Sequence, residues 1–444
     1  MPAPLYTLNA VQVLSLLKSN NVTVQDYAQS LLHRIHERNN TVEAWAYLDN
    51  AFVLDQAQAL DRVPQHKRGP LHGIAIGVKD TMNTKDMPTQ FGSPIYEGHR
   101  PGFDSSAVAI LRAAGALIFG KTTTTEFTVT NSGPNTTNPH DPNRTPGGSS
   151  CGSAAAVADM QVPLSLGAQT GGSIIRPASF SGVFAMKPTH DAISTEGQKA
   201  FAPTFDTFGF FARSIEDLQL LADVFALHDD EPPGEVPIEQ VSVALIKTPL
   251  WASAGPGTIA AVDEATKILM SCGAHVEEVS FPSEVSDAQA LKRIQKVITE
   301  GEAQATFLRE YRVDKTKLAP EICRLVENAS NYTKKERVQA YDTYANMRRI
   351  VDNIAEKYSV ILTPSAIDEA PLGLGDMGSA TFNTLWTASL GFHMPVINIP
   401  AFRGPNDMPI GVSLVAPRYR DQHLLKVSQI LGDAMAQNAY KKQV

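Results

Sequence analysis

A short glycine-rich stretch, GAQTGGSIIRPA at residues 167–178, places two hydroxyl side chains, Thr170 and Ser173, among three glycines. Glycines let backbone N–H groups turn towards a bound atom, so such a stretch suits either a phosphate or a developing oxyanion. A phosphate-binding P-loop needs a lysine directly after its last glycine. Ser173 stands at that position, which excludes the nucleotide interpretation and leaves a turn or a nucleophile.

A second stretch, Gly148 to Gly152, matches the G-x-S-x-G pattern of a nucleophile elbow with Ser150 at its centre. An elbow needs a strand directly before it, whereas the preceding residues NPHDPNRTPG contain three prolines, and proline is excluded from a central strand. The local sequence therefore disfavours an elbow. Composition leaves it open, because histidines that could complete a triad follow in the chain: His190, His228, His275, His393 and His423.

Lys79 closes the apolar run GIAIGV, which is typical of a short buried strand. A lysine held away from water loses the solvation of its ammonium form, so its pKa falls and it can act as a general base. The other interpretation is a solvated lysine at the point where the strand emerges. Lys79 alone does not decide between them.

Three segments occur in order: GIAIGVKD at 73–80, TPGGSSCGSAAAVA at 145–158 and GAQTGGSIIRPASFSGVFAMKPT at 167–189. Together they closely resemble the amidase signature family of Ser-Ser-Lys amide hydrolases, and the likeness extends over most of the chain. The resemblance implies an α/β fold in which a central mixed β-sheet is flanked by helices on both faces. It also implies a single domain over residues 1–444.

The resemblance assigns a role to each of the three polar side chains. Ser173 falls on the family's nucleophile, Ser149 on its bridging serine and Lys79 on its base. The bridging serine follows a cis peptide bond in the family, so we expect one between Gly148 and Ser149. The family's oxyanion hole is made by backbone N–H groups just before and at the nucleophile, which here are those of Thr170, Gly171, Gly172 and Ser173.

The chain departs from the common family pattern beside the nucleophile. Gln169 stands where most members have aspartate, and Arg176 follows Ser173 by three positions rather than two. Gln169 removes a negative charge close to the site, and we expect a structural role for Arg176. We predict that the substrate pocket is lined by side chains from neighbouring segments: Met82, Phe127, Gln169 and Trp386.

Alternating apolar runs and helical periods indicate the elements that must hold these residues. Helices are predicted at 11–17, 24–35 (with Thr23 as its N-cap), 151–160, 214–227 and 258–273, a helix followed by a strand at 105–122, and strands at 71–80, 241–246, 275–280, 359–364, 394–400 and 410–417. We divide the domain into N-terminal helices (1–62), a signature core (63–228), a variable helical part (about 281–357), and C-terminal strands with a closing helix (358–444).

The composition limits the class of protein. The formal net charge is −8 and the pI ≈ 5.8, which argue against nucleic acid or an anionic membrane as a partner. Cys151, Cys272 and Cys323 are widely spaced, so neither a disulfide framework nor a zinc cluster is expected. No apolar run spans a membrane and the N-terminus has no secretory pattern. We expect a cytoplasmic protein without a cofactor or a metal.

The function that the resemblance implies is hydrolysis of a small-molecule amide, anilide, carbamate or urea-like bond through an acyl-serine intermediate, with water as the second substrate. Two alternatives stay open. One is the catalytic subunit of a glutamine-dependent amidotransferase, which would need a partner protein. The other is a non-catalytic binding protein on the same scaffold. A homodimer is compatible with the sequence.

Overall fold

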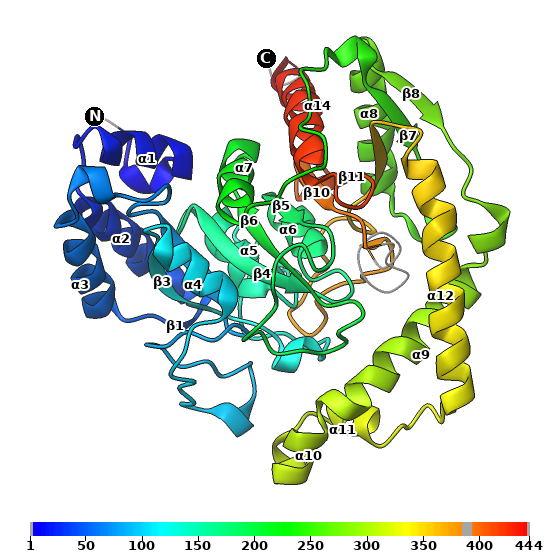
Figure 1. Ribbon diagram of the computed structural model, residues 1–444, viewed down its shortest axis with the longest axis horizontal. Coiled ribbons are helices and arrows are strands. Elements are labelled where there is room, and N and C mark those ends of the chain that lie inside the picture. The colour runs from blue at the N-terminus through cyan, green and yellow to red at the C-terminus, as the bar shows by residue number, and fades with distance from the viewer. Residues whose placement is uncertain (1–2, 384–392, 442–444) are drawn as a thin grey trace.

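The computed structural model describes residues 3–383 and 393–441. Its centre is a mixed β-sheet (Figure 1), and the described residues supply eleven strands in the order β1-β3-β2-β4-β6-β5-β10-β11-β9-β7-β8. The strands are β1 Trp45–Tyr47, β2 Ala75–Lys79, β3 Leu117–Thr122, β4 Leu164–Gln169, β5 Phe184–Lys187, β6 Thr207–Ala212, β7 Ser242–Leu245, β8 His275–Glu278, β9 Val360–Pro364, β10 Val396–Arg403 and β11 Pro409–Val415.

Helices flank this sheet, which confirms the predicted mixed α/β architecture. They are α1 Ala10–Lys18, α2 Val24–Val42, α3 Asn50–Asp61, α4 Ser106–Ala113, α5 Cys151–Ala158, α6 Ile175–Ser181, α7 Ile215–Val224, α8 Pro256–Ser271, α9 Ala288–Thr306, α10 Leu308–Asp314, α11 Pro320–Val326, α12 Lys334–Ala355 and α14 Asp421–Lys441. Thr23 caps α2 through a capping box with Asp26, which confirms the predicted start of this helix.

The three strands β4, β5 and β6 were not predicted from the sequence. Their sequences LSLGAQ, FAMK and TFGFFA lack a clear period of two, because these strands are buried on both faces of the sheet. Every residue of β4 and β6 is buried, and the two strands pair along their full lengths. Pairing with neighbours, which a single segment does not encode, makes LSLGAQ a strand.

One edge of the sheet gathers the chain ends that matter for the site. β2 runs parallel to β3 and β4, so all three end at the same edge. β4 is antiparallel to β6, and Gln169 at its end pairs with Thr207 at the start of β6. Lys187 at the end of β5 pairs with Val396 at the start of β10. The loops that leave this edge therefore lie side by side.

The helices α9–α12 form a separate group on the right of Figure 1, away from α1–α3. Here the prediction of a helical region without strands is confirmed within 288–355. The group packs partly on its own apolar clusters, one of which contains Phe127, Phe307 and Ile322. Two polar contacts tie it to the core: Lys199 Nζ lies 2.6 Å from Glu310 Oε1, and Glu302 accepts a hydrogen bond from the Thr204 amide at 3.0 Å.

Candidate active site

Lys79 is brought to the site by the end of β2. All five residues of this strand are buried, so the side chain enters the protein interior instead of water. Its Nζ donates to Ser149 Oγ at 2.8 Å, to Ser150 Oγ at 2.9 Å and to the Ala168 carbonyl at 3.3 Å. The strand end, the start of α5 and the end of β4 thus converge on one amino group.

The electrostatics at Lys79 favour a neutral amine. Burial lowers the pKa of Lys79 to about 7, which Cys151 and Asp206 oppose and which Arg176 reinforces. Within the described part of the chain, no carboxylate oxygen comes within 4.0 Å of Nζ to stabilise the ammonium form. The amino group is therefore held by two hydroxyls and a carbonyl, which suits a group that gains and loses a proton near neutral pH.

Ser149 and Ser150 lie where a loop enters α5. The peptide bond between Gly148 and Ser149 is cis, which confirms the prediction. Ser150 is the N-cap of α5, and its hydroxyl donates to the Ala168 carbonyl at 3.3 Å while it accepts from Lys79. The residues before Ser150 form turns instead of a strand, so the elbow geometry that G-x-S-x-G requires is not formed here.

Ser173 follows β4 and precedes α6. Its residue is 7% exposed, and among the residues that the structure describes none hydrogen-bonds its hydroxyl. The loop around it is closed by Gln169, whose Oε1 accepts from the Ile174 amide at 2.7 Å and from the Ile175 amide at 3.0 Å. Gln169, which we predicted as a pocket residue, is fully buried and braces the nucleophile loop from below.

The three residues before Ser173 are fixed from two sides. The Thr170 hydroxyl donates to the carboxylate of Asp206, and the other oxygen of that carboxylate accepts from the Phe201 amide at 2.7 Å. On the other side, a Cβ added at Gly172 would lie 2.6 Å from Asn383 Oδ1, a distance that excludes any larger residue. Close packing on Asn383 thus explains why glycine stands here.

Arg176 links the helix after the nucleophile to the bridging serine. Its guanidinium is buried and donates to the carbonyls of Gly148 and Gly378. The Gly148 carbonyl belongs to the cis peptide, so Arg176 joins the Ser149 loop to α6. This geometry is that of a structural residue, as we expected from its shifted position.

The remaining predicted pocket residues are not gathered at the three polar side chains. Met82 is 1% exposed and packs in the main core, and Phe127 is fully buried in the cluster with Phe307. Trp386 lies outside the described residues. The sequence gave Ser150 only a loop-supporting role, without its bond to Lys79. Asp206 was not predicted, because nothing in the sequence around it indicates that it reaches Thr170.

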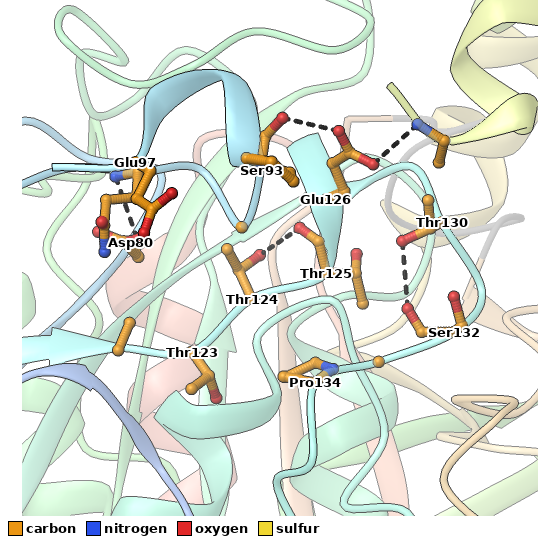
Figure 2. Close-up of a pocket in the computed structure, with 16 residues that line it drawn as sticks. Asp80, Ser93, Glu97, Thr123, Thr124, Thr125, Glu126, Thr130, Ser132 and Pro134 are labelled. Carbon is orange, nitrogen blue, oxygen red and sulfur yellow. Dashed lines mark hydrogen bonds between the residues drawn. The ribbon is translucent and has the colours of Figure 1, made fainter. Parts of the chain in front are cut away.

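A separate polar cavity of about 540 Å³ lies behind the strand ends (Figure 2). Asp80, directly after Lys79, lines it and forms a buried ion pair with Lys121, with Nζ 2.9 Å from Oδ1. Glu126 lines another wall, and its carboxylate accepts from Ser93 Oγ at 2.7 Å and from the Ala319 amide at 3.1 Å. Each of these carboxylates is already paired within the protein.

Two further features are absent from the described ranges. No group of three or more His, Cys, Asp or Glu side chains there is arranged to hold a metal ion. Within residues 3–383 and 393–441, no helix combines the length and the apolar character needed to span a membrane.

Comparison with known proteins identifies the family. A model of the Amidase family matches residues 26–425, which is most of the chain. The chain belongs to the amidase signature family. This family comprises hydrolases that act on carbon–nitrogen bonds, and the predicted resemblance is confirmed.

Relatives in the family include a glutamyl-tRNA(Gln) amidotransferase subunit from Symbiobacterium thermophilum, 31% identical over 474 residues that cover 95% of each chain. The corresponding chloroplastic/mitochondrial protein of Zea mays is 36% identical over 306 residues, which are 62% of this chain and 56% of that protein. The chain thus spans little more than half the length of the maize relative.

Solved structures of family members have the same fold. One described as an amidase superposes with a TM-score of 0.84 at 27% identity, covering 96% of this chain and 99% of the other. A bacterial aryl acylamidase superposes with a TM-score of 0.83 over 99% of both chains, and at 18% identity this likeness concerns the fold alone.

Proposed function

We propose that this chain hydrolyses a small-molecule carbon–nitrogen bond through an acyl-enzyme on Ser173, with Ser149 as the bridging serine and Lys79 as the base. The observation that carries the proposal is the buried contact of 2.8 Å between Lys79 Nζ and Ser149 Oγ. A lysine with a pKa of about 7 is half neutral at physiological pH, so it can accept the proton that an attacking serine must lose.

The proposed reaction has two stages. First, Lys79 takes the proton of Ser149, which takes that of Ser173, and the Ser173 oxygen attacks the substrate carbonyl. The carbon–nitrogen bond then breaks as the relay returns a proton to the leaving nitrogen. In the second stage water, deprotonated by the same relay, attacks the acyl-serine and releases the acid.

Backbone N–H groups of Thr170, Gly171, Gly172 and Ser173 would stabilise the negative oxygen that forms in each stage. Such donors are effective only when they are fixed before the reaction. The bond from Thr170 to Asp206 and the packing of Gly172 against Asn383 support this assignment, because both hold the loop. Loss of one such donor costs about 10²–10³ in kcat in other hydrolases.

The substrate class that we propose is a primary amide, anilide, carbamate or urea-like molecule, with water as co-substrate and with neither nucleic acid nor membrane as partner. We further propose that the chain is a single domain acting in the cytoplasm, compatible with a homodimer. The net charge of −8 and the three free cysteines support this setting.

A covalent label tests the proposal directly. A fluorophosphonate should add to Ser173, detected as a mass shift on the peptide that contains it, and Ser173→Ala should abolish both the label and hydrolysis of an amide panel. Ser253→Ala, which removes an exposed hydroxyl far along the chain, is the matched control and should label like the parent. A properly folded parent that takes no label on Ser173 would favour a non-catalytic binding protein instead.

A second candidate is the catalytic subunit of a glutamine-dependent amidotransferase. It is favoured by the names of relatives that match over 95% of the chain. The two functions separate in one assay of glutamine hydrolysis, run with the chain alone and with candidate partner subunits. Ammonia release from glutamine that depends on a partner would support the amidotransferase; hydrolysis of other amides by the chain alone would support the first proposal.

A further inference from the structure

A cavity of about 570 Å³ lies between α12 and the loops that leave the sheet at the ends of β5 and β11. It contains none of Lys79, Ser149 and Ser173, so it is separate from the site proposed above. Its walls carry two arginines, two histidines and three tyrosines, with Asp191 and Asp342 at its margin: Arg348, Arg418, His190, His393, Tyr341, Tyr344 and Tyr419.

The two arginines of this cavity differ in their partners. Arg418 is neutralised by Asp352, with Nη2 2.5 Å from Oδ2 and Nε 3.3 Å from Oδ1. Arg348 has no such partner: of the carboxylates that the structure describes, none has an oxygen within 4.0 Å of its guanidinium nitrogens. A half-buried guanidinium without a counter-ion is costly unless a ligand supplies the negative charge.

Arg348 is also held in a fixed orientation. Its Nη1 donates to Nδ1 of His393 at 3.1 Å, and its guanidinium lies over the Tyr344 ring at 4.9 Å from the ring centre. His393 accepts this bond because its Nε2 donates to the Thr204 carbonyl at 2.9 Å, and burial lowers its pKa so that the ring stays neutral. The ring of His190 stacks on it, with centres 4.1 Å apart.

This arrangement leaves one edge of the guanidinium available. One N–H is used by His393, and the planar group keeps further donors in the fork that matches two carboxylate oxygens. Tyrosine rings on the surrounding walls can pack against a flat organic group. Asp191 pairs with His190, Nδ1 to Oδ2 at 3.2 Å, which reduces its repulsion of an anion; Asp342 is exposed at the rim.

We infer that this cavity is a binding site for a small organic carboxylate, whose carboxyl group pairs with Arg348 and whose body lies among the tyrosines. The site goes beyond the proposed hydrolysis, because its residues take no part in the proton relay.

Benzoate is a suitable probe, since it combines a carboxylate with a flat ring. We would titrate it calorimetrically into the full chain carrying Ser173→Ala, so that the result does not depend on the proposed hydrolysis. Saturable binding at one site is expected. Arg348→Gln should weaken it by about 10- to 100-fold, the loss expected for hydrogen bonds to a charged group.

Two variants guard the interpretation. Arg348→Lys keeps the charge without the planar fork, so it should also weaken binding, by about 10-fold. Arg349→Gln removes the exposed neighbouring arginine and should leave the Kd within about twofold of the parent, as for other surface substitutions. Absence of saturable binding to the parent, equal binding to Arg348→Gln, or Arg348-dependent binding of inorganic phosphate in place of benzoate would each overturn the inference. Thermal unfolding shows that each variant is folded.

Discussion

Two fully buried lysines leave neighbouring strands of the sheet, and their surroundings are opposite. Lys121 in β3 donates to the Asp80 carboxylate at 2.9 Å and to Thr89 Oγ1 at 2.7 Å. Lys79 at the end of β2 meets only hydroxyls and a carbonyl within hydrogen-bond reach. Burial lowers the pKa of both side chains, but only Lys121 has a carboxylate beside it that favours the ammonium form.

This difference separates two uses of a buried amine. An ion pair such as Lys121–Asp80 stabilises the fold only while both partners are present. A lysine without a counter-ion contributes little to stability, but its pKa near 7 makes it a base. Substitutions that change the stability of the fold should therefore be separable from those that change the rate.

The largest expected effect is on activity. Lys79→Met keeps the volume of the side chain and removes the base, so kcat/KM for amide hydrolysis should fall by up to about 10⁴-fold. The free energy of unfolding should not fall, because methionine is buried at less cost than an amine. Steady-state kinetics and urea unfolding measure the two quantities. A variant with parental kcat at neutral pH would contradict the proposed relay.

The next effect is on stability. Lys121→Met leaves Asp80 buried without its partner, which should lower the free energy of unfolding by about 3–5 kcal/mol. Adding Asp80→Asn removes the stranded charge, and part of the lost stability should return. Urea unfolding of the single and the double variant checks this. If Lys121→Met were as stable as the parent, the pair would have no structural role.

A third effect is the pH dependence. Below the Lys79 pKa of about 7 the base is protonated, so kcat/KM should rise about tenfold per pH unit and level off above pH 7. The unfolded lysine binds its proton up to about 10.5, so the free energy of unfolding should rise with pH between those values.

Lys187 provides the control for this prediction. Burial also lowers its pKa to about 7, and it lies at the end of β5, apart from the three polar side chains. Lys187→Met should therefore reduce the pH dependence of stability while the pH profile of kcat/KM keeps its midpoint. A rate that stays level through pH 7 in the parent would rule out Lys79 as the titrating base.

The smallest effect concerns the family's usual aspartate. Gln169→Asp introduces a negative charge next to the residue whose carbonyl contacts Lys79, which should raise the Lys79 pKa. The midpoint of the kcat/KM profile should move to higher pH by up to about one unit. Gln169→Asn, which shortens the side chain without adding charge, is the control and should keep the midpoint. An unmoved midpoint in Gln169→Asp would show that position 169 does not tune Lys79.

The sequence was most informative where a local pattern has a local cause. The apolar run that ends at Lys79, the cap at Thr23 and the helical region within 288–355 were predicted because strand burial, capping and helical periods are properties of short segments. The order of the three glycine- and serine-containing segments predicted the family, and with it the cis peptide before Ser149.

What could not be predicted depends on contacts between distant segments. The strand β4 exists because β2 and β6 pair with it, and the contact of Ser150 with Lys79 joins residues 71 positions apart. Met82 and Phe127 follow motif residues in the sequence, yet their side chains turn into apolar clusters. Asp206 reaches Thr170 only because β6 begins where β4 ends.

The close approach of Gly172 to Asn383 has a consequence for how sequences of this family can diverge. The two positions share one small volume, where a Cβ at 172 would also come within 2.9 Å of the Cβ of Ala380. A substitution at 172 is therefore tolerated only together with a retreat of the segment around 380–383. Among homologues, these positions are expected to change jointly, and a lineage that enlarges residue 172 should record the exchange as correlated substitutions at 380 and 383.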